Sequence, residues 1–297
     1  MAESRVLITG GGGQLACALR ARWEERGQAE RITSLSRAEL DITGRDGVRA
    51  CLNSLRPGWI VNCAAFTAVD AAEDDPAAAF RVNDEAVGVL ADSAEEYGAR
   101  LVHVSTDYVF DGQKPAPYVE EDATHPINVY GASKLAGEER LRRHPVRSAV
   151  LRTAWLFGER ARNFVSWFLG AAKTAAGEGR PLPVVDDQVG SPTDVHTVAE
   201  QIETVIDEEM LGLYHAAAVG SASWFEFAQE IVRQMELAVQ LRPIAGAQLG
   251  RAARRAGKVV LENRRLNSMG RSRMIPWQDG LRRVVDRLGP QGGLFRA

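Results

Sequence analysis

The N-terminal segment constrains the fold more than any other feature, because it contains a strand, a glycine-rich turn and a helix in immediate succession. Arg5–Thr9 is short, apolar and β-branched, and four glycines, Gly10–Gly13, follow it. Gln14–Glu25 then carries apolar residues at helical spacing. The first glycine permits a tight turn, the last lets the backbone approach a phosphate, and the helix N-terminus attracts the anion. Ala16, at the third position of the glycine pattern, is small enough for close packing, so the segment predicts dinucleotide binding.

Further strands and helices alternate after this segment, which predicts a parallel sheet with crossover helices. Strands are expected at residues 59–64, 101–106 and 148–152. Three of the expected strands end at Thr9, Ala64 and Thr106. Ligands bind along the carboxyl edge of such a sheet, so these positions are candidate site positions.

The pattern loosens after about Asn163. A helix is expected through Ala176, a loop over Pro181–Thr193, and helices over Val195–Glu209 and Trp224–Met235. No linker rich in Pro, Gly or Ser separates this part from the rest. We therefore expect a dinucleotide-binding domain over residues 1–160, to which later segments return, and a smaller substrate-binding cap over residues 161–297.

The end of the second strand bears on the choice of dinucleotide. Arg31–Leu35 is the expected strand, and Ser36 and Arg37 follow where an NAD site normally has Asp or Glu for the ribose 2′-hydroxyl. A hydroxyl and a guanidinium suit a 2′-phosphate instead. We expect NADPH to be preferred, with NADH used more weakly.

Tyr130 and Lys134 stand four residues apart, which on a helix places the phenol and the ammonium on one face. A cation there would lower the pKa of the phenol and let it act as a general acid near neutral pH. A half-buried tyrosine and a solvated lysine would give the same spacing. The glycine turn upstream favours the catalytic interpretation.

Composition narrows the class of ligand. The net charge of −3 over 297 residues gives no general attraction to nucleic acid or to an anionic membrane. Residues 251–273 nevertheless hold eight Lys or Arg and one Glu, so an anionic ligand is expected there. The three cysteines and five histidines show no disulfide or metal-ligand spacing. Without a signal peptide or an apolar run of 18 residues, a cytoplasmic location is expected.

Several blocks together resemble the dTDP-4-dehydrorhamnose reductase family of extended short-chain dehydrogenases. They are residues 10–15, 62–70, 105–112, 130–138, 152–155 and 187–193. The resemblance covers nearly the whole chain. It implies a Rossmann-like, doubly wound α/β sheet that binds NADPH, and a smaller C-terminal α/β substrate domain. It also implies reduction of the C4 ketone of a dTDP-linked 4-keto-6-deoxyhexose, giving dTDP-L-rhamnose.

The resemblance also implies a set of site residues. The catalytic residues would be Thr106, Tyr130 and Lys134, with Tyr130 as proton donor. Besides Tyr130 and Lys134, the cofactor would contact Gly10, Gly12, Gly13, Gln14, Leu15, Ser36, Arg37, Asp41, Ile42, Cys63, Ala64, Ala65 and Thr67. The substrate would contact Val69, Asp70, Thr106, Asp107, Tyr108, Trp155, Asn163, Gln188 and Arg255. For Trp155, plain core packing is nearly as good an explanation.

Departures from the family lie mostly near the end of the chain. Residues 253–263 keep Arg255 and Leu261 but lack the proline and the serine usual there, so another 4-keto-6-deoxy sugar is an alternative substrate. A glutamate that binds an interface magnesium in some relatives is Ala18 here, and we expect no metal. Whether the protein forms a homodimer is left open.

Two alternative functions belong to other classes. The resemblance extends to the non-catalytic regulatory β subunit of methionine adenosyltransferase. A nucleic-acid binder acting through residues 251–273 is a remote alternative.

Overall fold

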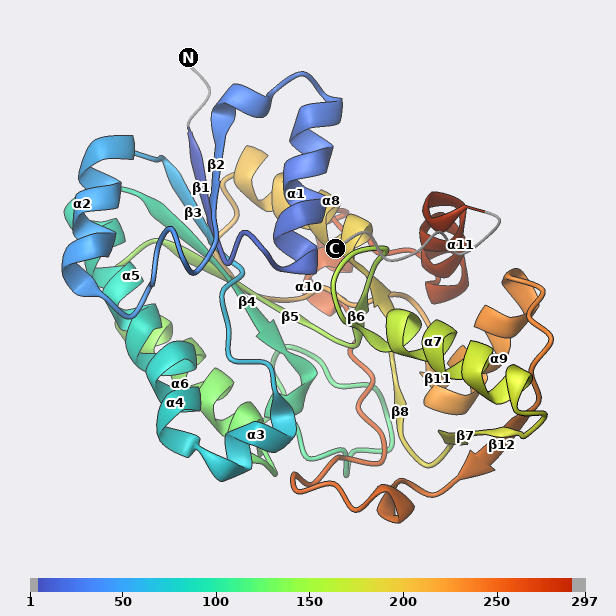
Figure 1. The fold of residues 1–297 in the computed structure, drawn as a ribbon. Coiled ribbons are helices and arrows are strands. Elements are labelled where there is room, and N and C mark those ends of the chain that lie inside the picture. Colours follow the sequence, from blue (N-terminus) through green and yellow to red (C-terminus); the bar gives the residue numbers. More distant parts are fainter. Residues whose placement is uncertain (1–4, 290–297) are drawn as a thin grey trace.

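The central element is a six-stranded parallel sheet in the order β10-β5-β4-β3-β1-β2 (Figure 1). The structure is a computed structural model that describes residues 5–289. The strands are β1 (Val6–Thr9), β2 (Ile32–Leu35), β3 (Trp59–Asn62), β4 (Arg100–Thr106), β5 (Ser148–Thr153) and β10 (Gly212–His215). Every neighbouring pair is parallel. The predicted fold class is confirmed.

Helices cover both faces of the sheet, because successive strand residues point to opposite sides. Val6 and Ile8 pack in one core with α1 (Gln14–Glu25) and α8 (Val195–Asp207), whereas Leu7 packs in another on the opposite face. That second face is covered by α2 (Arg45–Leu55), α5 (Ala86–Glu96) and α6 (Val129–Arg143). The segment before α5 contains α3 (Val69–Asp74), α4 (Pro76–Phe80) and a π-helical turn, η2 (Arg81–Glu85).

The second half of the chain builds a separate core beside the sheet (Figure 1). Its helices are α7 (Phe164–Gly177), α9 (Trp224–Gln234) and α11 (Trp277–Leu288), whereas α10 (Arg264–Ser268) packs through Leu266 into the core under the central sheet. Its strand pairs are β7 (Leu182–Val185) with β12 (Leu241–Ile244), β8 (Val189–Gly190) with β11 (Ala222–Ser223), and β6 (Leu156–Phe157) with β9 (Thr193–Asp194). Short 3-10 turns are η1 (Ala29–Arg31), η3 (Asp107–Val109) and η4 (Gly246–Leu249).

The expected loop over residues 181–193 is wrong, because three short strands lie within or reach into it. Each pairs with a segment distant in sequence, and local patterning carries no signal for such partners. Other bounds shift by one or two residues. No helix within residues 5–289 is long and apolar enough to cross a membrane.

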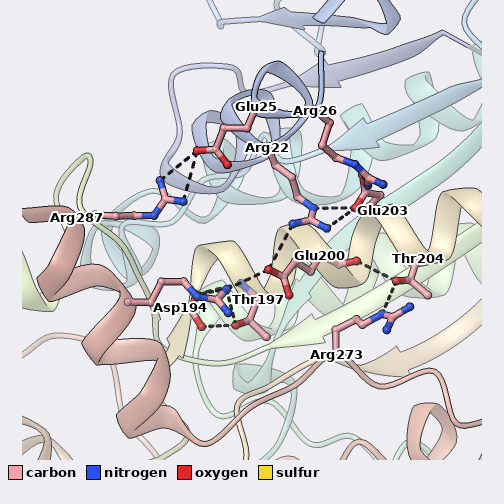
Figure 2. Close-up of polar contacts among 11 residues, drawn as sticks. Arg22, Glu25, Arg26, Asp194, Thr197, Glu200, Glu203, Thr204, Arg273 and Arg287 are labelled. Carbon is pink, nitrogen blue, oxygen red and sulfur yellow. Dashed lines mark hydrogen bonds and ion pairs between the residues drawn. The ribbon is translucent and has the colours of Figure 1, made fainter. Parts of the chain in front are cut away.

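A polar network joins α1, α8 and α11 across one face of the molecule (Figure 2). Glu203, on α8 and only 5% exposed, forms ion pairs with Arg22 and Arg26 of α1. Arg287 of α11 lies 3.5 Å from Glu25 of α1. The last helix is thereby tied to the helix that follows the glycine turn.

Candidate active site

The glycine turn at the end of β1 fits a dinucleotide phosphate. Gly10 has φ of +70°, and a Cβ there would lie 2.7 Å from the Ala64 nitrogen. Gly11 donates its N–H to Leu35 O, and its Cβ would lie 2.7 Å from Ser34 Oγ. Sequence reasoning did not assign Gly11, whose need for glycine comes from β2 and therefore from tertiary structure. Helix α1 has neither a side-chain cap nor an acidic residue in its first turn, which leaves N–H groups for an anion.

The position directly after β2 holds Ser36, as the sequence shows, but the following turn brings a carboxylate beside it. Glu39 folds back so that its Oε2 accepts from the backbone N–H and the Oγ of Ser36 at 2.8 and 2.7 Å. These bonds lower the pKa of Glu39. Arg37 beside it is exposed, and Asp41 accepts from Thr43. A carboxylate three residues after the hydroxyl cannot be read from the strand-end position alone.

One cavity of about 480 Å³ gathers most of the expected site residues at the carboxyl edge of the sheet. Those lining it are Gly13, Gln14, Leu15, Cys63, Ala65, Thr67, Val69, Thr106, Asp107, Tyr108, Tyr130, Lys134, Trp155 and Asn163. A smaller cavity of about 30 Å³, which shares Asp107, Tyr108 and Trp155, adds Gln188 and Arg255. The lining residues of these two cavities do not include Gly10, Gly12, Ser36, Arg37, Asp41, Ile42, Ala64 or Asp70.

Helix α6 positions Tyr130 and Lys134 through close backbone contacts. Asn128 caps the helix by accepting from the Gly131 N–H at 2.8 Å. A Cβ at Gly131 would lie 2.2 Å from Tyr108 O, and a Cβ at Gly137 equally close to Asn83 O. Glycine at these positions allows α6 to approach the segments after β4 and before α5.

Tyr130 and Thr106 both line the cavity. Burial raises the pKa of Tyr130, and the nearby Thr106 hydroxyl opposes this only in part. Lys134 Nζ donates to Val104 O at 2.7 Å and lies 3.3 Å from His103 Nε2. The prediction that the Lys134 cation lowers the pKa of the phenol is therefore wrong for this structure, because the ammonium is directed elsewhere and desolvation dominates.

Asp107 is a buried carboxyl group next to these residues. It accepts a hydrogen bond from Thr106 Oγ1 at 3.0 Å. Burial nevertheless raises its pKa to about 7. The cavity therefore holds a second group that can carry a proton near neutral pH.

Arg255 and Asp70, both expected at the substrate, form an ion pair with two bonds of 2.7 Å. The hydrogen bond from Arg255 lowers the pKa of Asp70 to about 2. Residues 251–273 do not all serve as one anion-binding stretch, because Arg265 pairs with Glu121 and Arg271 pairs with Glu208. These acidic partners come from distant segments, so the sequence pattern could not reveal them.

Trp155 stacks on Trp224, with ring centroids 3.4 Å apart and planes 1° from parallel. Its φ of +46° is unusual for a non-glycine residue, and a Cβ on Gly190 would lie 2.5 Å from the indole. Trp224 lines both cavities but was not identified from the sequence. The one local signal in the sequence is the capping box of Ser223 and Glu226, which indicates that α9 begins at Trp224 but not that Trp224 faces the cavity.

Asn163 is both a cavity residue and a helix cap. Its side chain caps α7 through the Ser166 N–H. Its Nδ2 also donates to Gln14 Oε1 at 3.1 Å and to Gly158 O at 2.9 Å. The amide therefore holds the segment after β6 against the glycine turn.

A glycine turn, a threonine, a tyrosine and a lysine at the carboxyl edge of a parallel sheet define a nicotinamide-dependent reductase of the extended short-chain dehydrogenase class. A family model described as RmlD substrate binding domain matches residues 4–289. The chain belongs to this family, that of the dTDP-4-dehydrorhamnose reductases, as its sequence motifs predicted.

Individual relatives match over nearly the whole chain. A dTDP-4-dehydrorhamnose reductase of Sinorhizobium fredii is 36% identical over 292 residues, which cover 95% of this chain and 96% of the relative. A probable dTDP-4,6-dihydroxy-2-methyloxan-3-one 4-ketoreductase of Streptomyces antibioticus is 39% identical, with 94% of this chain and 93% of the relative covered. The crystal structure of dTDP-4-dehydrorhamnose reductase from Bacillus anthracis in complex with NADP has a TM-score of 0.89 and 35% identity, covering 95% of this chain and 98% of that one.

Proposed function

We propose that this protein uses NADPH to reduce the C4 ketone of dTDP-4-dehydrorhamnose, giving dTDP-L-rhamnose. The observation that carries the proposal is the convergence of Thr106, Tyr130 and Lys134 in one cavity with the start of α1. Relatives that bear the name of this reductase match from end to end.

The residues present fit the dinucleotide. The uncapped start of α1 and the close contacts at Gly10 and Gly11 suit a pyrophosphate, as the geometry above indicates. We assign Ser36 and Arg37 to the 2′-phosphate side. The remaining cofactor contacts are assigned to Gly12, Gly13, Gln14, Leu15, Asp41, Ile42, Cys63, Ala64, Ala65 and Thr67. NADPH supplies the hydride for the ketone carbon.

The side chains of the protein stabilise and then neutralise the negative charge that develops on the ketone oxygen. As that oxygen becomes negative, Tyr130 donates its phenolic proton and Thr106 donates a hydrogen bond. A buried phenol keeps its proton until such a base is present, which follows from its raised pKa. Lys134 holds the nicotinamide ribose and acts as a cation once NADPH is bound.

The substrate contacts are assigned to residues that line the two cavities and to one ion-pair partner. They are Val69, Asp107, Tyr108, Trp155, Asn163, Gln188 and Arg255, with Asp70 as the partner of Arg255, and the structure leads us to add Trp224. Arg255 would leave Asp70 in part to bind the diphosphate. We divide the chain into a cofactor domain of residues 1–160 with its returning segments and a substrate cap of residues 161–297.

The test is NADPH oxidation measured with a panel of dTDP-4-keto-6-deoxyhexoses, with the product stereochemistry determined by NMR. Turnover of dTDP-4-dehydrorhamnose to the L-rhamnose product is the expected result. Tyr130→Phe serves as the matched inactive control. If no sugar in the panel is reduced, the proposed reductase activity is rejected. A non-catalytic binding role, such as that of the regulatory β subunit of methionine adenosyltransferase, would then be favoured.

A second candidate is the reduction of a different dTDP-4-keto sugar. It is favoured by the 39% identity to the Streptomyces antibioticus 4-ketoreductase and by the altered segment around Arg255. The same panel distinguishes the two, because the preferred sugar has the highest kcat/KM. A homodimer, testable by sedimentation, and a cytoplasmic location remain predictions.

A further inference from the structure

A chain of buried hydrogen bonds runs beneath the active site from the end of β1 to the lysine of α6. Its members are Thr9, Asn62, His103 and Lys134, and none of them is more than 2% exposed. The mechanism above uses only Lys134. The other three polar side chains occupy the core of the sheet without a role in that mechanism.

The backbone fixes the orientation of the Asn62 amide. The Ala64 N–H, which can only donate, lies 3.2 Å from Asn62 Oδ1, and Thr9 Oγ1 lies 2.7 Å from the same oxygen. The other amide atom, Nδ2, therefore donates to His103 Nδ1 at 3.1 Å. Burial holds the pKa of His103 well below its usual value, so the ring is neutral. A neutral imidazole that accepts at Nδ1 carries its hydrogen on Nε2.

This hydrogen points at the lysine, because His103 Nε2 lies 3.3 Å from Lys134 Nζ. An ammonium has only donors and opposes another donor, whereas an uncharged amine has a lone pair that accepts it. The bond from Nζ to Val104 O, at 2.7 Å, is satisfied by either form. The chain therefore favours the amine.

We propose that His103 is a positioning residue that holds Lys134 as an uncharged amine in the cofactor-free protein, so that the lysine takes up a proton from solvent when the anionic dinucleotide binds. The inference rests on the proposed NADPH-dependent chemistry, in which Lys134 acts as a cation. It does not depend on which sugar is reduced.

Other groups around the lysine do not reverse this preference. The titratable or charged groups that face the lysine or share its cavity come from several elements. They are His103 from β4, Cys63 after β3, Tyr130 and Glu138 from α6, Arg152 from β5 behind Glu138, Asp107 and Tyr108 after β4, and Arg162 before α7. Arg152 binds Glu138 at 2.7 Å and compensates its charge, and burial raises the pKa of Cys63 to about 12, so this thiol is neutral. Burial, opposed in part by Glu138 and Cys63, lowers the pKa of Lys134 to about 8. A facing N–H donor lowers it further.

The first experiment reads the tautomer directly in protein without cofactor or sugar. NMR of protein labelled with ¹⁵N-histidine reports which ring nitrogen carries hydrogen, and His103→Gln identifies the resonances of His103 by their loss. We expect Nε2 protonated and Nδ1 unprotonated between about pH 6 and 8. An Nδ1–H tautomer or an imidazolium at His103 of the wild-type protein would overturn the proposal. If the variant does not fold, sequence-specific backbone assignment of the wild-type protein identifies the His103 resonances instead.

The second experiment measures proton uptake when NADPH binds, by calorimetry at about pH 8 in buffers of different ionisation enthalpy. Wild-type protein should take up protons, and His103→Gln should take up fewer, because glutamine can turn a carbonyl oxygen toward Lys134. In the plot of kcat against pH, the basic limb of the His103→Gln variant should lie roughly one pH unit higher than that of the wild type. This corresponds to a tenfold change in the proton equilibrium. Equal uptake and equal profiles in wild type and variant would reject the role of His103.

The matched control is His215→Gln. His215 is also fully buried at the end of a strand of the same sheet, but its Nδ1 contacts Tyr118 O and Glu262 O instead of lysine. It should behave as wild type, and any contribution from the phosphates of NADPH is common to all three proteins. Failure of NADPH to bind would reject the proposed function while leaving the tautomer result valid.

Discussion

Tyr130 is held as a neutral phenol by burial, and its effect on the reaction can be isolated by removing one oxygen. Tyr130→Phe should lower kcat roughly 10²- to 10⁴-fold, the usual effect of a positioned general acid. NADPH affinity should change little, because the ring and its packing against Tyr108 remain. Single-turnover kinetics and cofactor titration check this. Wild-type turnover under conditions where chemistry is rate-limiting would exclude the role.

Arg255 is the cation best placed to bind the substrate diphosphate. Arg255→Ala should raise KM for the sugar nucleotide roughly 10- to 100-fold, the loss of one charged hydrogen bond. Arg251 is not a suitable control, because it lines a neighbouring cavity. Exposed Arg254 is therefore the better control. An unchanged KM in Arg255→Ala would leave the Asp70 pair as the only role of this arginine.

Asp107 should make stability depend on pH. Burial raises its pKa to about 7, so the folded protein keeps the proton that the unfolded chain releases above its ordinary pKa of about 3.9. Its contribution is fully present below about pH 4 and is lost as pH rises toward 7, by on the order of 1 kcal/mol per pH unit. Asp107→Asn should reduce this slope. Urea unfolding of both proteins between these pH values tests the prediction, and parallel slopes would contradict it.

Among the elements, α8 carries a buried charge, Glu203, that pairs with arginines of another element. Glu203→Gln should lower the free energy of unfolding by about 1–3 kcal/mol, because Arg22 and Arg26 lose a charged partner that is only 5% exposed. Glu24→Gln removes an exposed pair with Arg20 and should cost less than about 0.5 kcal/mol. Equal midpoints of denaturation for the two variants would show that the network in Figure 2 contributes nothing beyond surface pairing.

The elements also show what the sequence can and cannot predict. The strand ends at Thr9 and Thr106 and the helix carrying Tyr130 follow from local patterning, because burial and helical periodicity are written in adjacent residues. Trp224 and Gly11 were missed because their importance comes from contacts with distant segments, Trp155 and β2. The polarity of the Tyr130 environment was misjudged for the same reason, since desolvation is a property of the assembled site.

At the scale of the whole molecule, the central sheet is completed by a late segment. A chain that ends at residue 160 lacks β10, which pairs with β5, and α8, which covers β1 and β3 with α1. Such a chain should show no cooperative thermal unfolding when it is followed by circular dichroism. A chain that ends at residue 218 contains β10 and α8 and should show the β-sheet circular dichroism signal again. A sharp transition in the shorter chain would show that the first five strands suffice.

The late arrival of β10 also has a consequence during translation. Roughly 60 residues separate the end of β5 from the start of β10, which at about 5–20 residues per second takes roughly 3 to 12 seconds to synthesise. Over that interval the edge of β5 is without its parallel neighbour, and the apolar surface that α8 will cover is open. The nascent chain therefore depends on chaperones most strongly before Gly212–His215 leave the ribosome.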